Sequence, residues 1–168
     1  ARTALKPYYA GLLKVSDQEV NIAAIFTVGN IRLQAAEARL LSLFNNKKEG
    51  IEVRKEVLKA LVKLESRQLE SVLNLALSDQ NRNMRETAQS LLGEIQLPEP
   101  VKVSLLETIL NHNSIVEKQV ALQQLSLLKS NEAKVLLEFW FDQWMKGTLD
   151  PELQLDVWLA VANSSFSE

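Results

Sequence analysis

Two short stretches decide the fold, VRKEVLKALVKL at residues 53–64 and MRETAQSLLGEI at residues 84–95. Both follow the pattern apolar–Arg–x–x–(Val/Ala)–x–x–x–Leu–x–x–(Leu/Ile). Apolar residues at this spacing lie on one face of an α-helix. Because the second stretch begins 31 residues after the first, the sequence indicates a repeated helical unit.

Weaker copies of the pattern extend over the whole chain. The apolar residues that anchor the five copies are Val20, Val53, Met84, Val116 and Leu153. Successive anchors lie 33, 31, 32 and 37 residues apart, which is room for two helices per unit. In the copy from Val116, Glu117 stands where the copies from Val53 and Met84 have arginine.

Helical periodicity is present almost throughout, and no stretch alternates as a β-strand does. Residues typical of helix ends, such as Asp17, Gly50 and Pro98, separate the periodic segments. The ten helices that we expect are residues 2–14, 17–28, 31–44, 50–64, 66–77, 81–96, 99–111, 114–129, 131–146 and 150–163.

The last of these helices shows why the units must stack. Asp150 is a good N-cap and Pro151 suits the first helical position. The residues that follow are apolar on more than one side, so the helix needs neighbours on both sides. We therefore predict an all-α fold, a right-handed α-solenoid (superhelix) of about five stacked helical hairpins. It forms a single domain over residues 1–168, with the second helices lining the concave side.

The predicted core follows the apolar face of each helix. Its members are Ile22, Leu33, Leu40, Val57, Leu61, Val72, Leu75, Ala88, Leu92, Leu106, Leu110, Val120, Leu127, Leu136, Val157 and Val161.

Composition excludes several kinds of site. The 168 residues contain no cysteine, so disulfides, thiolate zinc sites and iron–sulfur clusters are excluded within this chain. His112 is the single histidine and lies in a polar NHNS turn, which favours a solvent-exposed residue over a metal ligand. No apolar run reaches the ~18 residues of a membrane span, so no membrane insertion is expected. We expect no cofactor, no metal and no catalytic residue.

The repeat pattern resembles that of HEAT repeats. The resemblance depends on the apolar–Arg pairs Val53–Arg54 and Met84–Arg85 near the start of second helices, each preceded by a polar turn such as SDQN at 78–81. It covers essentially the whole chain, although the period is shorter than the HEAT length. It implies a scaffold that binds other proteins, either adjacent domains or another chain.

A narrower resemblance concerns the stretch FWFDQWMKGTLDPELQLDVWLAV at residues 139–161. It is similar to the end of the helical region in large bacterial membrane-bound dehydrogenases, which carry a propeller, HEAT repeats and then a c-type haem domain. The matching residues are Trp144, Gly147, Leu149, Pro151, Glu152, Leu153, Gln154, Leu155 and Asp156. The resemblance implies that this chain is a fragment of a larger exported, periplasmic redox protein; without it, a cytoplasmic location is expected.

Two arginines and four aromatic residues are the candidate functional side chains. Arg54 and Arg85 occupy equivalent positions in successive units. They either bind an anionic partner or form a structural ladder that locks adjacent repeats, and we favour the ladder. The aromatic residues either pack internally with Trp158 or form an interaction surface. This candidate interaction surface consists of Phe139, Trp140, Phe141 and Trp144.

Nucleic acid is the alternative partner for a helical repeat, as in DNA glycosylases built on this fold. The net charge of −2 and the acidic residues among Lys47, Lys48, Arg54, Lys55, Lys59 and Lys63 argue against it. A continuous positive groove around Arg54, Lys55 and Arg85 would favour it, whereas alternating charges would not. The sequence thus predicts a non-catalytic scaffold or spacer, and leaves the oligomeric state open.

Overall fold

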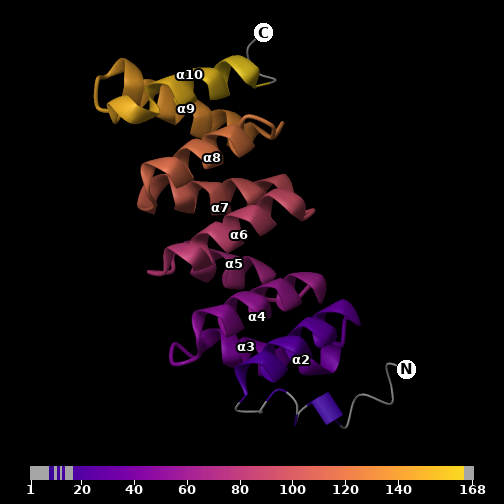
Figure 1. The fold of residues 1–168 in the computed structure, drawn as a ribbon. Helices are drawn as coiled ribbons and strands as arrows, with labels where there is room; N and C mark the ends of the chain where they lie inside the picture. The colour runs from indigo at the N-terminus through magenta and orange to yellow at the C-terminus, as the bar shows by residue number, and fades with distance from the viewer. Residues whose placement is uncertain (1–7, 10, 12, 14–16, 165–168) are drawn as a thin grey trace. The chain divides into compact units, whose positions relative to one another are not determined.

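Successive helices fold back on one another in the computed structural model, which describes residues 8, 9, 11, 13 and 17–164 (Figure 1). The α-helices of this part are α2 (Gln18–Asn30), α3 (Glu37–Asn45), α4 (Ile51–Lys63), α5 (Leu69–Leu77), α6 (Arg82–Glu94), α7 (Glu99–His112), α8 (Ile115–Leu125), α9 (Asn131–Met145) and α10 (Gln154–Asn163). Two 3₁₀ turns, η1 (Gln34–Ala36) and η2 (Pro151–Leu153), precede α3 and α10. The predicted helix 2–14 lies mostly outside the described residues.

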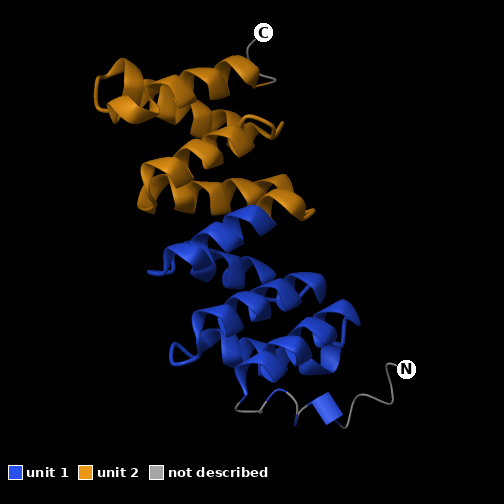
Figure 2. Cartoon of the chain, viewed as in Figure 1, with its two compact units in different colours: residues 1–91 blue, residues 92–168 orange. Residues whose placement is uncertain are grey.

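The chain divides into two compact units, residues 1–91 and residues 92–168 (Figure 2). In the first unit, α4 packs against α2, α3 and α5. In the second unit, α7 pairs with α8 and α9 pairs with α10, while α7 also packs on α9 and α8 on α10. First helices therefore pack on first helices in the second unit, and second helices pack on second helices within each unit. The predicted fold class, an all-α solenoid of helical hairpins, is confirmed.

The prediction of one domain over residues 1–168 stays a prediction. Each repeat in such an array contacts its neighbours alone, so an array can divide between any two repeats.

Two predicted helices, 31–44 and 66–77, begin later than expected. Arg32 and Glu65 both adopt left-handed backbone, with φ of 50° and 54°. The N–H of the residue after each one donates to the carbonyl five positions earlier, at 3.1 Å in both cases. This is the hydrogen bond of a Schellman motif, which ends the preceding helix and reverses the chain. Regular α-helix therefore resumes at Glu37 and at Leu69.

The register expected for α8 is wrong by one residue. Ser114 is the N-cap, and its N–H donates to the Glu117 carboxylate at 3.1 Å in a capping box. Counted from the N-cap, Glu117 therefore takes the position that Val53 has in α4, and it is buried. Lys118, not Glu117, is the residue at the arginine position.

Most of the predicted core is buried, and three members are wrong. Val120 is exposed because the shifted register of α8 turns Ala121 and Leu122 inward instead. Leu127 lies beyond the end of α8 and is exposed, and Leu75 lies on the side of α5 opposite its buried face. Ile22 and Val161 are half-buried. The buried members are Leu33, Leu40, Val57, Leu61, Val72, Ala88, Leu92, Leu106, Leu110, Leu136 and Val157.

Helices α2 and α4 approach each other closely at Gly29. A Cβ placed on Gly29 would lie 2.9 Å from the Cα and 3.0 Å from the Cβ of Ala60, closer than side-chain carbons approach one another. The atom in the way belongs to the backbone of α4, so it cannot move aside without moving the helix. Gly29 therefore sets the distance between these two helices.

We predict that Gly29→Ala lowers the free energy of unfolding by about 1–3 kcal/mol, the usual cost of overpacking a core. The measurement is urea unfolding followed by circular dichroism. Gly93→Ala is the matched control, because its added methyl group would meet the flexible Gln124 side chain at 3.2 Å. There we expect no loss and a gain of up to about 1 kcal/mol from helix propensity. Equal losses in both variants would contradict the close approach.

Candidate functional site

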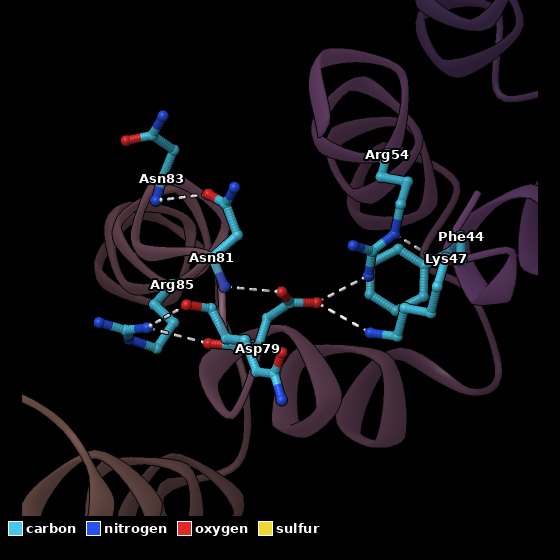
Figure 3. A network of polar contacts seen from close by, with 8 residues as sticks. Phe44, Lys47, Arg54, Asp79, Asn81, Asn83 and Arg85 are labelled. Atoms are coloured by element: carbon cyan, nitrogen blue, oxygen red, sulfur yellow. Dashed lines mark hydrogen bonds and ion pairs between the residues drawn. The ribbon is translucent and has the colours of Figure 1, made fainter. Parts of the chain in front are cut away.

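Asp79 is the centre of a buried polar network in the first unit (Figure 3). It lies in the turn between α5 and α6, and Figure 3 shows Arg54 of α4 and Lys47 pointing toward its carboxylate. One oxygen, Oδ2, accepts from an Arg54 guanidinium N–H at 2.7 Å and from the Lys47 ammonium at 2.9 Å. The other, Oδ1, accepts from the Asn81 N–H at 2.9 Å. The carboxylate thus joins the α3–α4 hairpin to the turn of the next hairpin.

Arg54 completes the link on the side of the α3–α4 hairpin. Its Nε donates to the carbonyl of Phe44 at 3.0 Å, and its guanidinium carbon lies 5.5 Å from the centre of the Phe44 ring. The side chains of Arg54 and Asp79 are each 6% exposed, so this ion pair is shielded from water. A buried charge of this kind is tolerated because both partners are also hydrogen-bonded.

Two opposing effects act on the pKa of Asp79. Burial raises it, whereas the Asn81 N–H and the cations of Arg54 and Lys47 lower it more strongly. The net result lowers the pKa from 3.8 to about 2. Asp79 therefore stays ionised at neutral pH, and its carboxylate stabilises the folded state there.

Arg85 supports the same turn from α6. Its guanidinium donates to the carbonyl of Asp79 at 2.9 Å and to that of Gln80 at 3.2 Å. The side chain of Asn81 accepts from the N–H of Asn83 at 2.9 Å, in the manner of an N-cap for α6. Both candidate arginines thus converge on the SDQN turn, Arg54 from the preceding repeat and Arg85 from its own. That they form a ladder which locks the repeats stays a prediction.

Sequence reasoning missed Asp79. The available signal was the apolar–Arg pattern itself, because an arginine on a core-facing helix surface needs a buried acceptor nearby. Asp79 is the acidic residue of the SDQN turn, 25 positions after Arg54.

A glutamate at the start of a first helix contacts the turn of the neighbouring repeat in each unit. Glu37, the first residue of α3, accepts from the Ser66 hydroxyl at 2.6 Å and from the Arg67 N–H at 2.9 Å. Glu99, the first residue of α7, accepts from the Lys129 N–H at 2.9 Å. In both cases the donor N–H lies 30 residues after the glutamate. We call these the cross-repeat carboxylate contacts.

One of these contacts also changes a pKa. The Ser66 hydroxyl lowers the pKa of Glu37, burial opposes this, and the Arg67 N–H lowers it further.

The four aromatic residues of α9 do not share one surface. Trp140 is buried, and the Lys118 ammonium lies 5.9 Å from the centre of its ring. Phe139 is 50% exposed and meets Trp140 edge to face, with 5.9 Å between ring centres. Phe141 and Trp144 are half-buried and form a similar pair at 5.6 Å. No ring contact joins any of the four to Trp158 within the described residues. Their role as an interaction surface stays a prediction.

A row of apolar side chains on α10 is exposed instead. Leu155, Trp158 and Leu159 are 64%, 50% and 40% exposed, and they lie three and four positions apart on one side of the helix. We call this surface the α10 face. The sequence indicated it by showing a helix that is apolar on more than one side.

Three of the four basic residues of α4 are paired with carboxylates. Lys55 and Lys59 pair with Glu52 and Glu56, one turn away on the same helix, and Arg54 is buried against Asp79. Charges therefore alternate along this helix.

His112 is exposed at the end of α7, as the NHNS turn predicted. Within the described part of the chain, no group of three or more His, Cys, Asp or Glu side chains lies close enough together to hold a metal ion. Over the same residues, no helix combines the length and hydropathy needed to cross a bilayer.

We predict that Asp79→Asn lowers the free energy of unfolding at pH 7 by about 3 kcal/mol, because it leaves the buried Arg54 without its counter-charge. The difference from the wild type should narrow between about pH 4 and pH 2. The pKa of Asp79 is lowered on folding, so its stabilising effect is complete above its ordinary pKa and is lost as the pH falls through about 2. Urea unfolding at a series of pH values measures both effects.

Glu65→Gln is the control for this prediction. It removes the exposed ion pair between Arg32 and Glu65, whose side chains are 58% and 73% exposed. Loss of such a pair changes stability by about 0.5 kcal/mol or less. A difference between wild type and Asp79→Asn that is independent of pH would contradict the role given to the Asp79 charge.

Comparison with known proteins agrees with this architecture. A family model for HEAT repeats matches residues 5–93, more than half of the chain. A search of curated proteins finds no match. The matched region contains the first copies of the repeat pattern, the Arg54–Asp79 network and the Glu37 contact. The chain belongs to the HEAT-repeat family.

Proposed function

We propose that this chain is a non-catalytic scaffold within a larger protein and that the α10 face is where the next part of that protein packs. The observation that carries the proposal is the exposure of Trp158. The residue at the equivalent position is buried in each of the other second helices, α2, α4, α6 and α8.

The position is defined by counting eight residues from the N-cap. It is occupied by Ile25 in α2, Leu58 in α4, Gln89 in α6 and Leu122 in α8, counting in α6 from the residue before Arg82. These four side chains are 0–6% exposed. Trp158, eight residues after the N-cap Asp150, is 50% exposed. A large aromatic residue at this position supports a further neighbour that covers it.

The packing of α8 against α10 indicates which kind of surface the covering neighbour would present to α10. Gln119 of α8 donates to the carbonyl of Glu152 at 3.2 Å and to the Asp156 carboxylate at 3.0 Å, beside the apolar contact between the two helices. Leu155 of α10 stands at the position of Gln119 and is apolar. The occupant that we propose is therefore another helix of the parent protein with an apolar side facing Leu155, Trp158 and Leu159.

Two further observations support a protein partner and a non-catalytic role. Lys55 and Lys59 of α4 are paired with glutamates on the same helix, which argues against the continuous positive charge that the nucleic-acid alternative needs. Burial raises the pKa of Asp79, but the Asn81 N–H and the cations of Arg54 and Lys47 outweigh it and lower that pKa. A pKa shift with such a structural cause does not call for acid–base chemistry.

The parent that we propose is an exported bacterial redox protein of the membrane-bound dehydrogenase type. The support is the resemblance of residues 139–161, which run from α9 through the turn at Gly147 and Asp150 into α10. In that setting the chain is a spacer that holds a catalytic and an electron-carrying domain at a fixed separation, and the location is periplasmic.

Footprinting tests the proposed role of the α10 face. Hydroxyl radicals applied to residues 1–168 alone and to the natural longer protein should oxidise Trp158 at least tenfold more slowly in the longer protein. Phe26, which is 51% exposed on α2, is the internal reference and should react equally in both. Equal oxidation of Trp158 in the two proteins would contradict the proposal.

The full reading frame tests the proposed parent. We expect a Cys-x-x-Cys-His haem-attachment motif after residue 168 and a propeller-like region before residue 1. A reading frame with neither feature would exclude the dehydrogenase-type parent and leave the scaffold role to be judged by footprinting.

A further inference from the structure

A groove between α7 and α9 lies on the side of the second unit formed by first helices. Its volume is about 570 Å³, and its lining comes from residues 100–111 of α7 and residues 131–139 of α9. Val103 and Leu136 form a buried floor, while Val135 and Phe139 are 54% and 50% exposed along one wall. The groove is thus an apolar channel that is open to solvent.

Acidic side chains flank this apolar floor. Glu107 of α7 and Glu132 of α9 both line the groove and are exposed. Neither forms an ion pair within the described residues, and no lysine, arginine or histidine is among the residues that line the groove. The remaining lining residues are small or uncharged, such as Ser104 and Asn131. The groove therefore combines an apolar channel with uncompensated negative charge.

From this combination we propose that the α7–α9 groove binds a basic amphipathic helix of a partner protein. Apolar side chains of that helix, spaced three and four residues apart, contact Val135 and Phe139. Its lysine or arginine side chains face Glu107 and Glu132. Helices commonly dock in this way into apolar grooves between two helices. Residues 100–111 span about three helical turns, so the bound segment has a similar length.

Electrostatics decides in favour of this partner over an acidic one. An acidic segment would place its carboxylates against Glu107 and Glu132, which costs free energy at an apolar surface where water is displaced. The inference rests on the proposed scaffold function, because it names a second partner for the same array. It concerns α7 and α9, however, whereas the scaffold proposal concerns the α10 face.

Peptide binding tests the groove. The probes are two fluorescein-labelled 14-residue peptides with the same leucine stripe at helical spacing, one with lysine and one with glutamate at the polar positions. Fluorescence anisotropy with residues 1–168 at 150 mM salt should show at least tenfold tighter binding of the lysine peptide. Phe139→Ser should weaken that binding at least fivefold. The double variant Glu107→Gln/Glu132→Gln should weaken it similarly and reduce its salt dependence.

Matched variants separate the groove from other surfaces. Leu75→Ser removes an equally exposed apolar residue from α5, and Glu70→Gln removes an exposed carboxylate from the same helix. Neither should change binding of the lysine peptide. Circular dichroism and the unfolding midpoint confirm that each variant is folded.

Each outcome has one meaning. Loss of binding in the groove variants alone supports the inference. A further variant, Leu155→Ser, removes an exposed apolar residue of the α10 face. Loss of binding in Leu155→Ser, with the groove variants unaffected, places the peptide on the α10 face and overturns the inference. Equal binding of both peptides, or binding of neither, also overturns it. None of these results changes the oxidation of Trp158 in the longer protein, so the scaffold proposal stands or falls separately.

Discussion

The buried ion pair between Arg54 and Asp79 is the constraint on which the first unit depends. Two charges leave water, and each must then be satisfied by the protein. Arg54 achieves this with a carbonyl of its own hairpin, and Asp79 with a backbone N–H of its own turn. The pair is favourable in one relative position of the two hairpins, because sliding one hairpin along the other would leave a buried charge without its partners. Apolar packing alone would tolerate more sliding.

The apolar contacts between repeats lie on helix faces, whereas several of the polar contacts lie at the turns. Helix faces carry the burial, from Val57 and Leu61 in α4 to Leu122 and Leu125 in α8. Turns carry several of the polar contacts between repeats, through Asp79 in one place and through Glu37 and Glu99 in others. Burial stabilises the stack without fixing its geometry, since the hydrophobic effect is not directional. The hydrogen bonds at the turns are directional, and they fix the position of one repeat relative to the next.

The helices and most of the core follow from apolar spacing, which is a local property of the sequence. That is why the all-α fold class and core positions such as Val57 and Leu92 could be predicted. The register of α8 could not, because Glu117 occupies a buried position through its capping box and so interrupts the apolar pattern on which the register was based.

The candidate site was less accessible from sequence than the fold. Arg54 and Arg85 stood out because they repeat, whereas Asp79 became identifiable once stacking brought residues 25 positions apart into contact. The aromatic residues of α9 were conspicuous by composition, yet composition cannot tell which side of a helix faces a neighbour. Trp140 is buried and Phe139 is half exposed, although they are adjacent in sequence. The α7–α9 groove requires two helices from different hairpins, so no single stretch of sequence indicates it.

The cross-repeat carboxylate contacts have a bearing on how such a chain can evolve. The donors at Arg67 and Lys129 are main-chain N–H groups, which every amino acid except proline supplies. Arg67 and Lys129 can therefore be replaced by almost any other residue without loss of these bonds, provided that the turn keeps its length. The bond therefore constrains the spacing of 30 residues and the glutamate, but not the side chain of the residue that donates. This accounts physically for repeats whose sequences diverge widely while the helices continue to stack in the same way.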